Sequence, residues 1–215
     1  MGGSGQDVGV PMEERAKRLG VMGGTFDPIH YGHLVTAEEA LWQFGLDGVM
    51  FVPTGRPWMK QEREVTPAED RYLMTVIATA SNPHFSVSRI EVDRRGPTYT
   101  VDTLEQIRTE AKEPIDLFFV TGADAILEIF HWKDPEEILS NAHFIAATRP
   151  GYELARLETE ADTSHPNVSV MHVPALAISS TDIRRRVAEG EPIRYLVPDG
   201  VKTYIDKSGL YRWPA

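Results

Sequence analysis

Short apolar runs alternate with longer amphipathic stretches along most of the chain. The apolar runs are rich in β-branched and aromatic residues, as expected for strands that are covered on both faces. Such runs predict strands at residues 19–22, 49–53, 85–92, 115–121, 144–148 and 168–173. Strands that alternate with helices are typical of βαβ units, and these units build parallel sheets.

The stretches between the runs carry apolar residues at helical spacing. Leu34, Ala37, Leu41 and Phe44 follow one another at intervals of three or four residues, and Gly45 fits a helix end. The same reasoning predicts helices at 68–80, 101–111, 125–129, 135–140, 183–188 and 198–207. Because crossovers between parallel strands are right-handed, we expect an α/β fold with a Rossmann-like open parallel sheet and helices on both faces.

The length of 215 residues suits a single domain with a sizeable core. The opening segment is rich in glycine and polar residues and has no hydrophobic period. We therefore expect residues 1–17 to be a disordered leader or a remnant of cloning, and residues 18–215 to form the domain.

Charge and cysteine content exclude several classes of function. The formal net charge of -10 argues against non-specific nucleic-acid binding, so an anionic ligand needs a local basic site. No apolar run approaches the roughly 20 residues that a membrane span requires. The absence of cysteine excludes disulfides and thiolate metal sites, and no secretory leader opens the chain. A cytoplasmic location is the default expectation.

The segment from Gly23 to His33, GGTFDPIHYGH, follows the first predicted strand. Gly23 and Gly24 allow the backbone to approach a phosphate, and the N-terminus of the following helix attracts anions. His30 and His33 are three residues apart, so in a first helical turn both imidazoles face one phosphate. Such a pair also fits two surface histidines or a zinc site, but no third ligand accompanies it. The complete string favours phosphate binding.

A second unusual segment, ISSTDIRRR, spans Ile178 to Arg186 after the last predicted strand. Its Ser-x-x-Asp pattern is a helix cap, and the helix N-terminus is a second anion site. Ser180 and Arg184 are four residues apart and share a helix face, where a guanidinium group binds phosphate oxygens. The alternative is a capped surface helix with a solvated basic stripe. Among the arginines, we favour Arg184.

Weaker signals follow other strands. Gly122 and Asp124 suit ribose hydroxyls, and Thr98 with Tyr99 forms a turn that could hold a carboxylate, although a plain helix cap or turn explains each as well. Trp132 suits stacking on a heterocycle or burial in the core, and Lys60 is otherwise a surface lysine. Because the carboxyl ends of parallel strands share one edge, we expect these segments to form one site.

These residues resemble a known family. GGTFDPIHYGHL and ISSTDIRRR are similar to the motifs of nucleotidyltransferases with a Gly-x-Phe-Asp-Pro-x-His-x-Gly-His signature. Within that superfamily, GPTYTVDT, FFVTGADA, FHWKDPEEIL, ATRPGY and YLVPDGVKTYI resemble the bacterial nicotinate-mononucleotide adenylyltransferases, from about Leu19 to Tyr211. The resemblance implies that ATP and nicotinate mononucleotide give nicotinate adenine dinucleotide and pyrophosphate in NAD biosynthesis, with Mg²⁺ bound through the ATP phosphates.

The resemblance also implies roles for single residues. It gives catalytic roles to His30, His33 and Arg184. It implies ATP contacts by Gly23, Gly24, Thr25, Gly122, Asp124, Arg149, Ile178, Ser179 and Ser180. It implies substrate contacts by Lys60, Thr98, Tyr99 and Trp132. The chain departs from many relatives at Pro57-Trp58-Met59-Lys60, where they have Pro-Pro-His-Lys.

The expected chemistry needs no side-chain base, because the acceptor phosphate is already an ionised nucleophile. Catalysis would consist of positioning and charge stabilisation. Two alternatives stay open: an adenylyl- or cytidylyltransferase for another phosphorylated acceptor such as phosphopantetheine, and a non-catalytic nucleotide-sensing module. A dehydrogenase or a P-loop NTPase is disfavoured because their glycine-rich motifs are absent after the first strand. A homo-oligomer is possible.

Overall fold

The structure is a computed structural model that describes residues 15–55, 65–123, 134–148, 165–174 and 176–212. Its centre is a six-stranded sheet in the order β3-β2-β1-β4-β5-β6. All neighbouring strands pair in parallel. The strands are β1 (Lys17–Gly24), β2 (Gly48–Pro53), β3 (Phe85–Val87), β4 (Ile115–Gly122), β5 (His143–Thr148) and β6 (Val168–His172).

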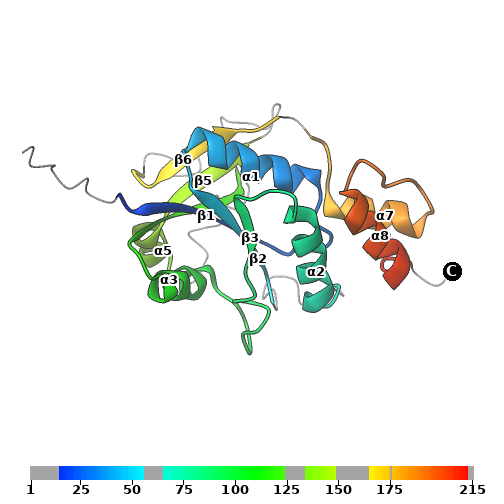
Figure 1. The fold of residues 1–215 in the computed structure, drawn as a ribbon, viewed down its shortest axis with the longest axis horizontal. Coiled ribbons are helices and arrows are strands. Elements are labelled where there is room, and N and C mark those ends of the chain that lie inside the picture. Colours follow the sequence, from blue (N-terminus) through cyan, green and yellow to red (C-terminus); the bar gives the residue numbers. More distant parts are fainter. Residues whose placement is uncertain (1–14, 56–64, 124–133, 149–164, 175, 213–215) are drawn as a thin grey trace, which may run out of the picture.

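Helices cover both faces of this sheet (Figure 1). The described helices are α1 (Tyr31–Gln43), α2 (Ala68–Thr79), α3 (Thr100–Glu110), α5 (Pro135–Asn141), α7 (Ser180–Ala188) and α8 (Asp199–Ser208). Helices α3 and α5 lie together on one side, whereas α7 and α8 extend the opposite side next to α2 (Figure 1). The expected α/β fold with a Rossmann-like parallel sheet is confirmed. None of the described helices is long and apolar enough to cross a membrane.

Alternate residues of each strand point to opposite faces and build two cores. Along β4, Phe118 and Val120 pack with α1, α2, α7 and α8 in one core. Leu117 and Phe119 pack with α3 and α5 in the other. This two-sided burial explains why the central strands appear in the sequence as nearly continuous apolar runs.

Several helices and strands begin or end at other residues than the sequence predicts. The helix expected from Leu34 begins at Tyr31, and that expected from Ile183 begins at Ser180. The strand expected at 85–92 is wrong beyond Val87, because the backbone amide of Asp93 donates to the carbonyl of Arg89 in a turn. The helix expected at 125–129 lies outside the described residues.

The start of the fold differs slightly from the expected boundary at residue 18. Strand β1 begins at Lys17, and Arg15 donates to Asp47 at 2.7 Å, so the ordered contacts begin before that boundary. Residues 1–14 lie outside the described residues, and a leader there stays a prediction.

A buried arginine joins the carboxyl ends of β1 and β2. Arg71 of α2 is only 1% exposed. Its guanidinium group donates to the carbonyls of Thr25 at 2.7 Å, Thr54 at 2.7 Å and Gly55 at 3.1 Å, and its Nε donates to that of Thr66 at 2.8 Å. Burial lowers the pKa of Arg71, and the negative charge of the nearby Asp27 opposes this shift. The side chain of Arg71 thus binds backbone carbonyls in the loop after β1 and in the loop after β2.

We predict that Arg71→Met lowers the free energy of unfolding by about 3 kcal/mol or more, because it leaves several buried carbonyls without a donor. Urea unfolding measures this loss. The matched control is Arg89→Met, which removes a partly exposed arginine that pairs with Glu69 and Asp93 and lies over the ring of Tyr72, and it should shift the midpoint much less. Equal midpoint shifts in the two variants would contradict the assignment.

Candidate active site

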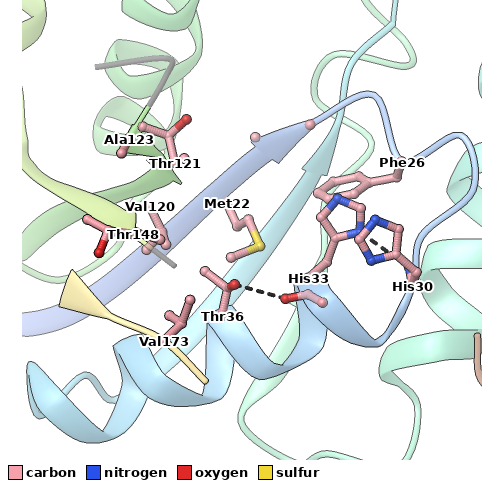
Figure 2. A pocket seen from close by; sticks show the side chains of 15 residues that line it. Met22, Phe26, His30, His33, Thr36, Val120, Thr121, Ala123, Thr148 and Val173 are labelled. Carbon is pink, nitrogen blue, oxygen red and sulfur yellow. Dashed lines mark hydrogen bonds between the residues drawn. The ribbon is translucent and has the colours of Figure 1, made fainter. Parts of the chain in front are cut away.

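A cavity of about 350 Å³ opens at the carboxyl ends of β1 and β4. These neighbours form the switch point of the sheet, because the chain continues from β1 to β2 on one side and from β4 to β5 on the other. Open α/β sheets bind ligands at such a point. The cavity lining includes Gly23, Gly24, His30, His33, Gly122 and Thr148, as Figure 2 shows in part. The expected convergence at one sheet edge is thus confirmed for the segment from Gly23 to His33 and for Gly122.

The two histidines of the motif lie side by side at the start of α1 (Figure 2). Their rings stack with centroids 3.8 Å apart and an angle of 23° between the planes. The rings of Phe26 and His33 form a T-shaped contact with centroids 5.1 Å apart, so His33 packs against a second ring. The expectation that both imidazoles share one face of the first helical turn is confirmed.

The helix cap fixes the tautomer of His33. The backbone amide of His30, the N-cap residue, donates to Nδ1 of His33 at 3.2 Å. An acceptor nitrogen carries no hydrogen, so in the neutral ring the hydrogen is on Nε2. His33 occupies the position where a capping box usually has Glu or Gln. The imidazole of His33 thus caps the helix with Nδ1 and carries its hydrogen on Nε2.

The glycines of the motif make room for rings as well as for a ligand. A Cβ atom on Gly24 would lie 2.8 Å from the ring of Phe26, and one on Gly32 would lie 3.0 Å from the ring of His30. Phe26 itself has a φ of 48°, in the left-handed region that side chains other than glycine rarely adopt. The motif therefore specifies a packed loop in addition to the phosphate approach expected from the sequence.

The N-terminus of α7 docks on this loop. Ser179 accepts from the backbone amide of Asp182 at 3.1 Å, which confirms the expected cap. Ser180 donates to the carbonyl of Pro28 at 2.9 Å, and Arg184 donates to that of Asp27 at 2.5 Å. Both side chains hold the loop, and their contacts with ATP phosphates stay predictions. Ile178, expected to contact ATP, is buried in the core.

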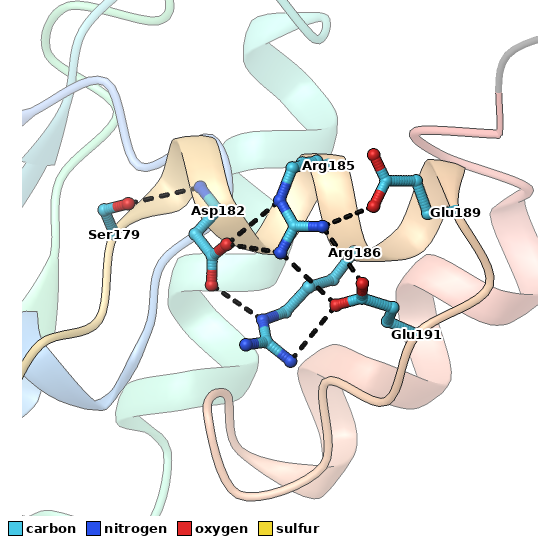
Figure 3. A network of polar contacts seen from close by, with 6 residues as sticks. All are labelled: Ser179, Asp182, Arg185, Arg186, Glu189 and Glu191. Atoms are coloured by element: carbon cyan, nitrogen blue, oxygen red, sulfur yellow. Dashed lines mark hydrogen bonds and ion pairs between the residues drawn. The ribbon is translucent and has the colours of Figure 1, made fainter.

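The neighbouring arginines belong to a separate ionic network, shown in Figure 3. Arg185 pairs with Asp182 at 2.8 Å and with Glu189 and Glu191, and Arg186 pairs with Asp182 at 2.7 Å. Hydrogen bonds from Arg186 and Arg185 lower the pKa of Asp182. The carboxylates of Asp182, Glu189 and Glu191 thus neutralise Arg185 and Arg186. Arg184 instead lies against the loop, where it binds the carbonyl of Asp27.

The other predicted contacts divide into three groups. Gly122 lines the cavity, with no atom within 4 Å of the place that its Cβ would occupy. Thr98 and Tyr99 precede α3 and do not line this cavity, because Thr98 packs near Gly55 after β2 and is only 5% exposed. Lys60, Asp124, Trp132 and Arg149 lie outside the described residues.

Sequence reasoning missed the polar residues behind the loop. Asp27 is 3% exposed and accepts a hydrogen bond from the hydroxyl of Tyr211 at 2.8 Å. Arg71, described above, holds Thr25. A signal for Arg71 existed, since it shares a helix stripe with Met74 and Ala78, where an unpaired charge would be costly. No local pattern relates Tyr211 to Asp27, because the two residues are far apart in the sequence.

Among the described residues, no group of three or more His, Asp or Glu could hold a metal ion. The polar groups that line the described cavity are mainly imidazoles and threonine hydroxyls. A hard cation such as Mg²⁺ prefers oxygen ligands, so this lining suits a cation that arrives with the phosphates of a nucleotide.

Comparisons with known proteins agree with this geometry. The family described as cytidylyltransferase-like matches residues 21–186. A probable nicotinate-nucleotide adenylyltransferase of Acidothermus cellulolyticus is 58% identical over 94% of this chain and 97% of its own. Its counterpart from Streptomyces coelicolor is 62% identical over 89% of this chain and 99% of its own.

Solved structures show the same fold. The nicotinic acid mononucleotide adenylyltransferase of Plasmodium falciparum, complexed with NaAD, has a TM-score of 0.74 at 21% identity and covers 92% of this chain and 98% of its own. A protein from Vibrio parahaemolyticus, described as a putative nicotinate-nucleotide adenylyltransferase, has a TM-score of 0.66 at 20% identity, with 92% and 97% covered. The chain therefore belongs to the cytidylyltransferase-like family and, within it, to the nicotinate-nucleotide adenylyltransferases.

Proposed function

We propose that this chain transfers the adenylyl group of ATP to nicotinate mononucleotide, giving nicotinate adenine dinucleotide and pyrophosphate. The observation that carries the proposal is the stacked pair of His30 and His33, which lines the cavity at the switch point of the sheet. The helix N-terminus beneath the pair adds partial positive charge where a phosphate would sit. Family membership supports adenylyl transfer as the reaction.

The chain's residues would act by positioning and by stabilising charge. The acceptor phosphate attacks the α-phosphorus of ATP, and the bond from that phosphorus to the bridging oxygen of the leaving pyrophosphate breaks. Nε2–H of His33 would donate to a phosphate oxygen as charge develops on it. Ser179, Ser180 and Arg184 are proposed to contact the β and γ phosphates from α7, because the loop against which this helix packs also carries the histidines.

Mg²⁺ is proposed to enter with ATP and to bind through its phosphate oxygens and water. When bound, it would neutralise charge on the departing pyrophosphate. The chain itself contributes donors that hold the phosphates rather than a cage of carboxylates: the one carboxylate in the loop, Asp27, is buried and accepts from Tyr211.

Nicotinate mononucleotide is the proposed acceptor because the curated relatives are described as nicotinate-nucleotide adenylyltransferases. The roles of Gly122, Asp124 and Arg149 near the adenosine stay predictions. The same holds for Lys60, Thr98, Tyr99 and Trp132 near the acceptor. The cytoplasmic location expected from the sequence is likewise a proposal.

The proposed reaction is tested by pyrophosphate release from ATP with nicotinate mononucleotide, nicotinamide mononucleotide or phosphopantetheine as acceptor. We expect the highest kcat/KM with nicotinate mononucleotide and no release without an acceptor. Preference for phosphopantetheine would support the alternative acceptor class, and ATP binding without release on any acceptor would support a nucleotide sensor.

We predict that His33→Ala lowers kcat by roughly 10² to 10³, the scale of losing one preorganised donor to a developing charge. The matched control is His84→Ala, at an exposed position before β3 and away from the cavity, which should retain wild-type kcat. Circular dichroism establishes that both variants are folded. Wild-type turnover in a folded His33→Ala protein would refute the role of this imidazole.

A further inference from the structure

The chain after α8 returns to the phosphate-binding loop. Helix α8 ends at Ser208, Gly209 adopts a φ of 64°, and Tyr211 then packs against the core formed with α1, α2 and α7. Its hydroxyl donates to Oδ1 of Asp27 at 2.8 Å. Asp27 lies three residues before His30, so a residue near the end of α8 contacts the loop that presents the catalytic histidines.

Asp27 is held from two sides. Arg184 of α7 donates to its backbone carbonyl at 2.5 Å, with the guanidinium also 3.9 Å from carboxylate atom Oδ2. Tyr211 binds the other carboxylate oxygen. A carboxylate that is only 3% exposed needs such donors, because an unpaired charge there would be strongly destabilising. The side chain and the backbone of Asp27 thus have separate anchors.

The backbone on both sides of this contact has an uncommon conformation. Phe26, next to Asp27, has a φ of 48°, and Tyr211 has a φ of 62°. A left-handed conformation is costly for a residue other than glycine, and it persists only where the surroundings enforce it. Burial raises the pKa of Tyr211, and the charge of Asp27 raises it further, so the phenol keeps its proton and stays a donor.

We propose that Tyr211 is a positioning residue for adenylyl transfer, which acts through Asp27 to fix the loop that presents His30 and His33 to ATP. The proposal rests on the function proposed above. It assigns part of the catalytic geometry to the segment after α8, outside the matched family region of residues 21–186. A donor misplaced by about 1 Å costs up to roughly 10² in rate, so a remote anchor has a measurable effect.

The chain offers a matched control in helix α8, which precedes Tyr211. Tyr204 of α8 donates its hydroxyl to Oδ1 of Asp70 in α2 at 2.7 Å, which also joins a phenol to a carboxylate of another element. Asp70 lies in the first turn of α2 and not in the loop. Both substitutions to Phe remove one hydrogen bond and keep the ring, but only Tyr211→Phe releases the loop.

The test measures kcat and both KM values for the wild type, Tyr211→Phe and Tyr204→Phe, at a temperature well below the Tm of each protein. We expect Tyr211→Phe to lower kcat by about 10- to 100-fold with KM for nicotinate mononucleotide within about twofold, and Tyr204→Phe to retain kcat within about twofold. Hydrogen exchange of the amides of residues 25–33 should accelerate in Tyr211→Phe only.

A double-mutant cycle separates positioning from a merely structural role. In the His33→Ala background, Tyr211→Phe should lower kcat by a clearly smaller factor than in the wild type, because one of the two donors that it positions is gone. The proposal is overturned if Tyr211→Phe keeps wild-type kcat, if Tyr204→Phe loses as much, or if the two effects multiply in full. An inactive wild type in the same assay would instead refute the proposed function.

Discussion

The candidate site depends on the hydrogen bonds that hold the backbone carbonyls of the loop after β1. The carbonyl of Thr25 is held by Arg71, that of Asp27 by Arg184 and that of Pro28 by Ser180. These donors come from α2 and α7, which also pack in the same core. A loop whose acceptors are bound in advance need not reorganise when charge develops on a ligand, which is the condition for strong electrostatic stabilisation.

The sheet places this loop beside the cavity at the carboxyl ends of β1 and β4. Strands β1 and β4 pair in parallel at the switch point, and the cavity opens at their carboxyl ends. The alternation along β4 buries Phe118 and Phe119 on opposite faces, so the sheet beneath the cavity packs between two cores. The same interactions therefore stabilise the fold and shape the site. Arg71 is an example, because it is buried and also holds the loop after β1.

Sequence reasoning recovered the features that are local. The period of apolar residues predicted the parallel sheet, and the GGTFDPIHYGH string predicted two donors on one face at a helix start, because residues three apart in sequence are neighbours in a helical turn. It failed where partners are distant. The Tyr211–Asp27 bond and the bonds from Arg71 to the carbonyls of Thr25 and Thr54 join different elements, which no single segment encodes.

The central claim is that the loop is already shaped for the triphosphate, and a crystal structure with a non-hydrolysable ATP analogue tests it most directly. The account predicts that Thr25 and Pro28 keep their bonds to Arg71 and Ser180, and that Nε2 of His33 lies about 3 Å from a phosphate oxygen. Phosphates bound away from His33, or a loop that exchanges these partners on binding, would contradict it.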